Sequence, residues 1–167
     1  ILYFGLLDHA PLELISAIGE AGFKIDLFGR DITMESLSAR LGYEIPSFVN
    51  VCGSYSPEKM DFLEEYAFLM LYKPEVRTLN YMYALPNKLF QSLGYGVSVL
   101  YSGNFVELGE FIGTVDGAGA MIETESDLSR VLRKLSKSRD SKYFSEVVRL
   151  SGEANEESRK AYLKVVF

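Results

Sequence analysis

The stretch that decides the fold reads Tyr83-Ala84-Leu85-Pro86-Asn87-Lys88-Leu89-Phe90-Gln91-Ser92-Leu93-Gly94-Tyr95-Gly96-Val97-Ser98-Val99-Leu100. It predicts a helix that begins at Pro86, ends at the Gly94/Gly96 pair and is followed at once by a buried strand. Pro86 suits the first helical position because its missing N–H would have no partner there. A helix N-terminus presents unpaired N–H groups and a partial positive charge, which favour a phosphate. Lys88 opposes the usual preference for acids in a first turn, so it also indicates an anionic ligand.

Composition limits the class of protein. The chain has 167 residues, of which 48% are hydrophobic, and this suits one domain, residues 1–167, with a substantial core. A formal net charge of −6 argues against a nucleic-acid surface. Cys52 and His9 are the only residues of their types, so neither a disulfide within the chain nor a site rich in His or Cys is expected. A single cysteine fits a reducing compartment, so we expect a cytoplasmic protein. The chain opens inside a strand-like run without an initiator Met, so we expect a piece of something longer.

Apolar strand-like runs alternate with amphipathic helical runs. The expected strands are Ile1–Phe4, Phe23–Phe28, Ser47–Cys52, Ala67–Leu71, Val97–Tyr101 and Ala118–Ile122. The expected helices are Pro11–Ala21, Thr33–Leu41, Ser56 to about Glu65, Pro86–Gly94, Phe105–Ile112, Thr124–Leu135 and a charged tail from about Lys142. This alternation predicts an α/β fold, a Rossmann-like doubly wound parallel sheet of about six strands with helices on both faces, plus C-terminal helices.

Ligands of such sheets bind beyond the carboxyl ends of the strands. Gly5, Gly29 and Gly53 each follow an expected strand, and the loop before Pro86 follows another. All four should therefore meet at one edge of the sheet, and the predicted phosphate-binding helix should begin there.

At this point the sequence resembles a family. The segment from Pro86 to Gln91, followed by Gly96-Val97-Ser98-Val99, looks like the donor-site segment of bacterial glycosyltransferases of the GT-B fold, which have two Rossmann-like domains. The strand and glycine at residues 1–5, those at 25–29 and the segment at 50–58 follow in the same order and spacing. The resemblance covers about residues 1–135. It implies a C-terminal domain that binds a nucleotide-sugar, with an acceptor-binding domain preceding Ile1.

The resemblance also implies a binding site. The base would lie near the loop after the third strand, and the diphosphate between the turn after the first strand and the Pro86 helix. The candidate nucleotide-sugar-binding residues are Gly5, Gly53, Tyr55, Tyr83, Pro86, Asn87, Lys88, Leu89 and Gln91. No catalytic residue is assigned. No metal or further cofactor is expected beside the sugar donor. The expected partners are the donor, the preceding domain and a glycan or lipid-linked acceptor, which implies contact with the inner membrane face through that domain.

The sequence departs from the family pattern at three places. Gln91 stands where relatives carry the acid that holds the ribose, and a neutral amide accepts hydrogen bonds less strongly than a carboxylate. Tyr83 stands where many relatives have a second acid. The four residues directly after Gly5, from Leu6 to His9, include no Arg or Lys, although the family often places cations beside the diphosphate there.

Several residues have a plain alternative role. Asp8 and His9 form an adjacent acid–imidazole pair suited to proton transfer, but an ordinary polar loop explains them better. Tyr55 suits either stacking on a base or capping the sheet edge. Cys52 is expected to be a small core hydrophobe at the end of a buried strand.

Two main hypotheses follow. The first is a glycosyltransferase domain that binds a nucleotide-diphosphate sugar for transfer to a hydroxyl acceptor, with surface polysaccharide synthesis as one setting. The second is a non-catalytic domain of the same fold that binds a partner or a glycan. A nucleotide-sugar epimerase, a flavodoxin-like domain and a receiver-like domain fit the sequence less well.

Overall fold

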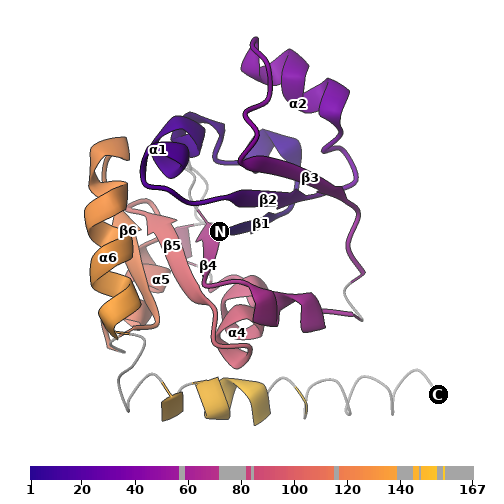
Figure 1. The fold of residues 1–167 in the computed structure, drawn as a ribbon. Helices are drawn as coiled ribbons and strands as arrows, with labels where there is room; N and C mark the ends of the chain where they lie inside the picture. The colour runs from indigo at the N-terminus through magenta and orange to yellow at the C-terminus, as the bar shows by residue number, and fades with distance from the viewer. Residues whose placement is uncertain are drawn as a thin grey trace, which may run out of the picture.

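A computed structural model describes residues 1–56, 59–71, 82–83, 85–114, 117–138, 145–146, 148–153 and 156. Its centre is a six-stranded parallel sheet with the order β3-β2-β1-β4-β5-β6 (Figure 1). The strands are β1 (Leu2–Phe4), β2 (Ile25–Phe28), β3 (Val49–Gly53), β4 (Phe68–Leu71), β5 (Ser98–Ser102) and β6 (Gly119–Ile122). The predicted doubly wound α/β sheet is therefore confirmed. The order reverses beside β1, so the crevice between β1 and β4 is the expected ligand position.

The α-helices are α1 (Ile15–Glu20), α2 (Met34–Leu41), α4 (Asn87–Gly94), α5 (Val106–Gly113) and α6 (Leu128–Ser138). Short 3-10 helices are η1 (Leu7–His9), η2 (Leu12–Leu14), η3 (Asp61–Glu65) and η4 (Glu125–Asp127). Three predicted helices differ. Those expected at 11–21 and 124–135 begin as the 3-10 helices η2 and η4 and continue as α1 and α6. The expected start at Ser56-Pro57-Glu58 lies partly outside the described residues, and the segment that follows it is only the 3-10 helix η3.

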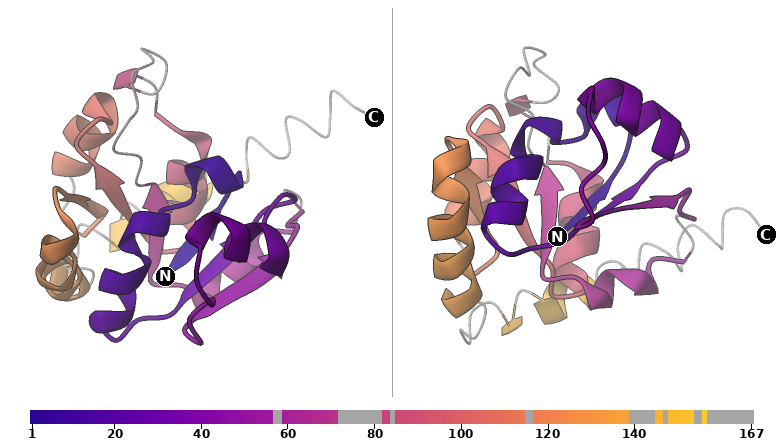
Figure 2. Two further views of the ribbon diagram at one scale, coloured as in Figure 1. Left: turned by 90° about the horizontal axis from the view of Figure 1, so that it is seen from above. Right: turned by 45° about the horizontal axis from the view of Figure 1, so that its top comes forward.

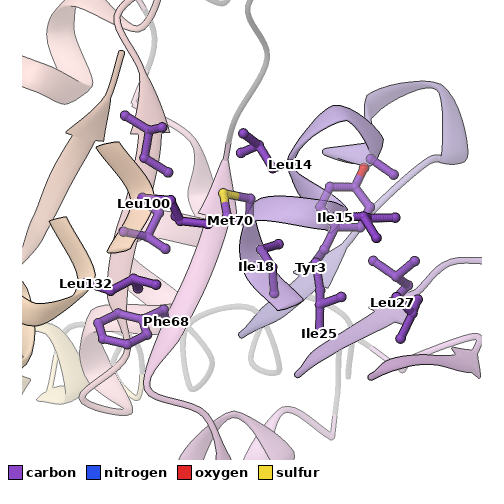
Figure 3. Packing of buried hydrophobic residues seen from close by; sticks show 14 of the residues in the cluster. Tyr3, Leu14, Ile15, Ile18, Ile25, Leu27, Phe68, Met70, Leu100 and Leu132 are labelled. Carbon is purple, nitrogen blue, oxygen red and sulfur yellow. The ribbon is translucent and has the colours of Figure 1, made fainter. Parts of the chain in front are cut away.

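Helices cover both faces of the sheet, as predicted. On one face, α1, α2 and α6 pack against a cluster that includes Tyr3, Ile25 and Met70. Figure 3 shows this cluster, with Leu132 of α6 beside Phe68 and Leu100. α6 also lies beside α1, although more than a hundred residues separate them in sequence (Figure 2).

The opposite face carries η3, α4 and α5. Its cluster joins Leu2, Phe4 and Leu69 of the strands to Leu89 and Leu93 of α4. Side chains of a strand alternate between the two faces, so neighbouring strand residues enter different clusters. Tyr3 and Phe4 therefore belong to opposite faces at the end of β1.

β3 lies at one edge of the sheet, and this changes the environment of Cys52. The prediction that Cys52 is a buried core residue is wrong, because its side chain is exposed. As an edge strand, β3 has a hydrogen-bonded neighbour on one side only, and Asn50 on the same face is exposed as well. An apolar run alone cannot distinguish a central strand from an edge strand.

The charged tail is described only in pieces. Residues 145–146, 148–153 and 156 are helical, in agreement with the prediction, and Arg149 pairs with Glu146 and Glu153 at 2.7 Å. Val148 packs against the same cluster as α4. The sequence also suggests that the apolar end of the tail, residues 162–167, packs against the preceding domain, and these residues lie outside the described ranges. None of the helices in the described ranges is both long and apolar enough to cross a membrane.

Candidate functional site

Three strands end close together at the carboxyl edge of the sheet. The N–H of Gly5 donates to the carbonyl of Phe28 at 2.9 Å, and the N–H of Gly29 donates to the carbonyl of Gly53 at 2.8 Å. A Cβ atom on Gly29 would lie 2.2 Å from the carbonyl oxygen of Gly5. This oxygen belongs to the backbone and cannot move aside as a flexible side chain could. Gly53 has φ of +74°, a conformation that favours glycine. The predicted convergence of these glycines at one edge is confirmed.

α4 begins at this edge, one residue later than predicted. Pro86 is the N-cap and not the first helical residue, because its ψ of 137° is extended while its carbonyl already accepts from the N–H of Leu89 at 2.9 Å. Pro86 has no polar side chain to cap the helix. The first amides of an α-helix, here those of Asn87 and Lys88, have no acceptor within the helix. Asn87 as a residue is exposed.

Lys88 reaches from α4 to the end of β1. Its Nζ donates a hydrogen bond to the carbonyl oxygen of Phe4 and lies 4.6 Å from the centroid of the Phe4 ring and 5.9 Å from that of Tyr3. Burial lowers the pKa of the Lys88 ammonium below its usual value. Within the described part of the chain, no carboxylate forms an ion pair with it. Parallel sheets commonly bind ligands at this edge. A half-buried cation with no ion pair in the described ranges would favour an anion there.

Gly5 makes room for this arrangement. A Cβ atom at Gly5 would lie 3.1 Å from Lys88 Nζ and 2.6 Å from the hydroxyl of Tyr3. That hydroxyl donates to the carbonyl of Leu6 at 2.6 Å and so fixes the turn after β1. The structure thus brings together the predicted residues Gly5 and Lys88. It adds Tyr3 and Phe4, which the sequence shows only as apolar strand residues.

Tyr55 packs against the same group. Its ring meets the ring of Phe4 edge to face, with centroids 5.1 Å apart and an interplanar angle of 69°. The Tyr55 side chain is half-buried, as one expects for an aromatic residue that caps the sheet edge. This contact favours the capping role and leaves the stacking on a base as a prediction.

The remaining candidates lie around α4. Gln91 is half-buried and follows Lys88 by three residues, so both project from one side of the helix. The side chain of Leu89 is fully buried in the core, so it points away from any ligand at the edge. Tyr83 is 56% exposed, in a two-residue described fragment before α4.

The loop after β1 is held by side chains from the segment after β2. Asp8 forms an ion pair with Arg40 of α2 at 3.2 Å, and the N–H of Leu7 donates to Asp31 at 2.8 Å. Asp8 therefore has an arginine partner, which supports the ordinary polar loop over the acid–imidazole pair. Arg40 and Asp31 were missed by sequence reasoning, because no motif links them to the loop. Throughout the described ranges, no group of three or more His, Cys, Asp or Glu residues is arranged to hold a metal ion.

The comparisons with known proteins agree with this fold. No family model matches the sequence, and no curated protein matches it. AviGT4, a glycosyltransferase involved in avilamycin A biosynthesis, matches with a TM-score of 0.61 and 17% identity over 98% of this chain and 51% of its own. WaaG, a glycosyltransferase involved in lipopolysaccharide biosynthesis, matches with a TM-score of 0.59 and 18% identity over 91% of this chain and 42% of its own.

HepE of Anabaena, solved in complex with UDP, matches with a TM-score of 0.56 and 10% identity over 99% of this chain and 49% of its own. A second structure of HepE contains UDP-glucose. The chain thus spans about half the length of the solved structures that it matches, which corresponds to one domain. The resemblance to GT-B glycosyltransferases is confirmed at the level of the fold.

Proposed function

We propose that this chain is the donor-binding domain of a glycosyltransferase and binds a nucleotide-diphosphate sugar between the end of β1 and the N-terminus of α4. The observation that carries the proposal is the Lys88 ammonium. It lies beside Gly5 at the carboxyl edge of the sheet, half-buried, and no carboxylate in the described ranges neutralises it. A diphosphate would supply the missing negative charge.

The groups around Lys88 suit a diphosphate leaving group. The amides of Asn87 and Lys88 point out of the helix start, where the helix dipole adds a partial positive charge. Such fixed donors stabilise the charge that develops when the sugar leaves the nucleotide. Gln91, three residues after Lys88, would hold the ribose through its amide.

The other half of the reaction would belong to a domain outside this sequence. That domain would bind the hydroxyl acceptor and, in an inverting enzyme, supply the general base. Two of the similar proteins act in lipopolysaccharide and avilamycin A biosynthesis, and a third was solved with UDP-glucose. The UDP-glucose complex supports a uridine nucleotide as the first ligand to test, and the lipopolysaccharide enzyme supports surface polysaccharide synthesis as one setting. By itself the chain should not transfer sugar, because half of the cleft would be absent.

One observation favours a second function, a non-catalytic domain that binds a partner or a glycan. The loop after β1, where relatives often carry cations, is held by Asp31 and by the Asp8–Arg40 pair. Its Leu7 amide already has an acceptor. This loop therefore offers a ligand fewer free donors than the α4 side of the site does.

Isothermal titration of UDP and GDP into the purified chain distinguishes the two functions. We expect UDP to bind with a dissociation constant in the millimolar range or lower, because one side of the cleft retains part of the affinity for the nucleotide. Replacement of Lys88 by Ala should weaken UDP binding about tenfold or more, since a hydrogen bond to a charged group contributes about 1.5–3 kcal/mol.

Lys134→Ala is the matched control, because it removes one exposed lysine from α6, which packs on the opposite face of the sheet. Equal UDP affinity of the two variants would contradict the site at α4. A folded chain that binds neither nucleotide would favour the non-catalytic domain.

A further inference from the structure

We infer that Phe4 is a positioning residue that holds the Lys88 ammonium at the end of β1, so that a diphosphate meets a cation already in place. The inference deepens the proposed function and rests on it. Phe4 is 2% exposed, and it would act on a ligand only through Lys88.

The position of the ammonium follows from the two rings near it. Tyr3 and Phe4 point to opposite faces of the sheet, yet Lys88 Nζ lies within 6 Å of both ring centroids. The ammonium therefore lies at the end of the strand and not over one face of it. Gly5 follows with no side chain, and Lys88 Nζ and the Tyr3 hydroxyl lie in the space that a Cβ atom there would enter.

Phe4 contacts the ammonium in two ways. Its carbonyl oxygen accepts a hydrogen bond from Nζ, and its ring lies at 4.6 Å, well within the range of a cation–π interaction. A lysine ammonium has three N–H donors, so the Phe4 carbonyl occupies one and two remain for other acceptors.

An aromatic ring beside Lys88 affects the charge of the ammonium differently from a carboxylate. A carboxylate would hold Lys88 but would also cancel its charge. The ring attracts the ammonium through its quadrupole and leaves the net charge at +1. Lys88 is thus fixed and still attractive to an anion, at an edge where no carboxylate in the described ranges pairs with it.

The Phe4 ring is itself held in place. Tyr55 meets it edge to face at 5.1 Å, and the ring belongs to the cluster beneath α4 that contains Leu89 and Leu93. A ring fixed by packing can define the position of a flexible lysine side chain, which otherwise loses much rotamer freedom when a ligand orders it. Most of the rotamer freedom of Lys88 is therefore already lost before a ligand binds.

Stepwise fluorination of the ring tests this role with little change in shape. Phenylalanine at position 4 is replaced by its 4-fluoro, 3,5-difluoro and 3,4,5-trifluoro analogues, which progressively reduce the electron density of the ring face. The same analogues at Phe68, which is 1% exposed in the opposite cluster, are the matched control. NMR titration of the Lys88 side chain gives its pKa, and calorimetry gives the affinity for UDP.

We expect the pKa of Lys88 to fall stepwise with fluorination at Phe4, because the ring favours the charged ammonium. UDP binding should weaken in the same order, about threefold to tenfold for the trifluoro ring. Fluorination at Phe68 should change neither quantity, which excludes a general effect on core packing.

Two results would overturn the inference, and they differ from each other. If UDP binds and Lys88→Ala weakens it but fluorination at Phe4 changes neither the pKa nor the affinity, Phe4 has no positioning role and the proposed function stands. If fluorination lowers the Lys88 pKa but the unmodified chain binds no UDP, the proposed function fails, and the positioning of Lys88 for a donor fails with it.

Discussion

Replacement of Gly5 by Ala tests how tightly the end of β1 is built. The new Cβ atom would lie 2.6 Å from the Tyr3 hydroxyl and 3.1 Å from Lys88 Nζ, and both are too close for ordinary contact. Lys88 has a flexible side chain and can withdraw. Tyr3 is 4% exposed and its hydroxyl donates a hydrogen bond to the carbonyl oxygen of Leu6. Displacement of the Tyr3 side chain therefore disturbs core packing and breaks this hydrogen bond.

The expected cost follows from these two contacts. Overpacking of a filled site destabilises by about 1–3 kcal/mol, and the loss of one neutral hydrogen bond adds about 0.5–1.5 kcal/mol. We therefore expect Gly5→Ala to lower the free energy of unfolding by about 1.5–4.5 kcal/mol in urea denaturation. UDP binding should weaken as well, because the methyl group occupies space beside the Lys88 ammonium.

A second substitution separates the two effects. Tyr3→Phe in the Gly5→Ala background removes the closest atom, so part of the stability should return while UDP binding stays weak. Gly113→Ala is the control, since a Cβ atom there has no neighbour within 4 Å. The reasoning would be refuted if Gly5→Ala were as stable as Gly113→Ala and bound UDP as the unmodified chain does.

Three further predictions concern the same edge of the sheet and its support. Gly29→Ala should lower the free energy of unfolding by at least about 2–3 kcal/mol in urea denaturation, because its Cβ atom would lie 2.2 Å from the backbone oxygen of Gly5. An unchanged free energy of unfolding would show that the ends of β1 and β2 can separate. Calorimetry at rising pH should show that UDP affinity begins to fall at a pH below 10.5, the usual lysine pKa, because burial lowers the pKa of Lys88. Between the lowered pKa and 10.5 the unfolded chain binds more protons than the folded chain, so Lys88 makes the free energy of unfolding rise with pH. Loss of affinity only above 10.5 would argue against the buried position. Arg40→Gln should cost no more than about 1 kcal/mol of stability by thermal denaturation, because the Asp8–Arg40 pair is exposed, and a larger loss would mean that α2 holds the β1 loop more strongly than its contacts suggest.

The sequence was sufficient for the layers of the fold. The apolar strands alternate with helices that have one apolar face, and a parallel sheet covered on both sides is the arrangement that buries them all. The meeting of Gly5, Gly29 and Gly53 at one edge could be predicted because the carboxyl ends of parallel strands lie at the same edge of a sheet. The start of α4 was predicted within one residue, because proline and the helical pattern after it limit where the helix can begin.

The errors came from features that sequence patterns do not contain. Cys52 belongs to an apolar run, but its exposure depends on β3 being an edge strand, which is a property of strand order. The contact between Lys88 and Phe4 joins residues 84 positions apart, and only the packing of α4 against β1 creates it. Likewise, Arg40 and Asp31 reach the β1 loop through the fold and not through a motif.

An amide NMR titration of the chain with UDP would show directly where the donor diphosphate binds. If the donor diphosphate lies between the end of β1 and the start of α4, the largest shift changes should fall on Gly5, Asn87 and Lys88, with saturation at the affinity measured by calorimetry. The backbone amides of α6, on the opposite face, should stay unchanged. Saturable changes centred on α6, with none at the start of α4, would contradict a donor site between β1 and α4.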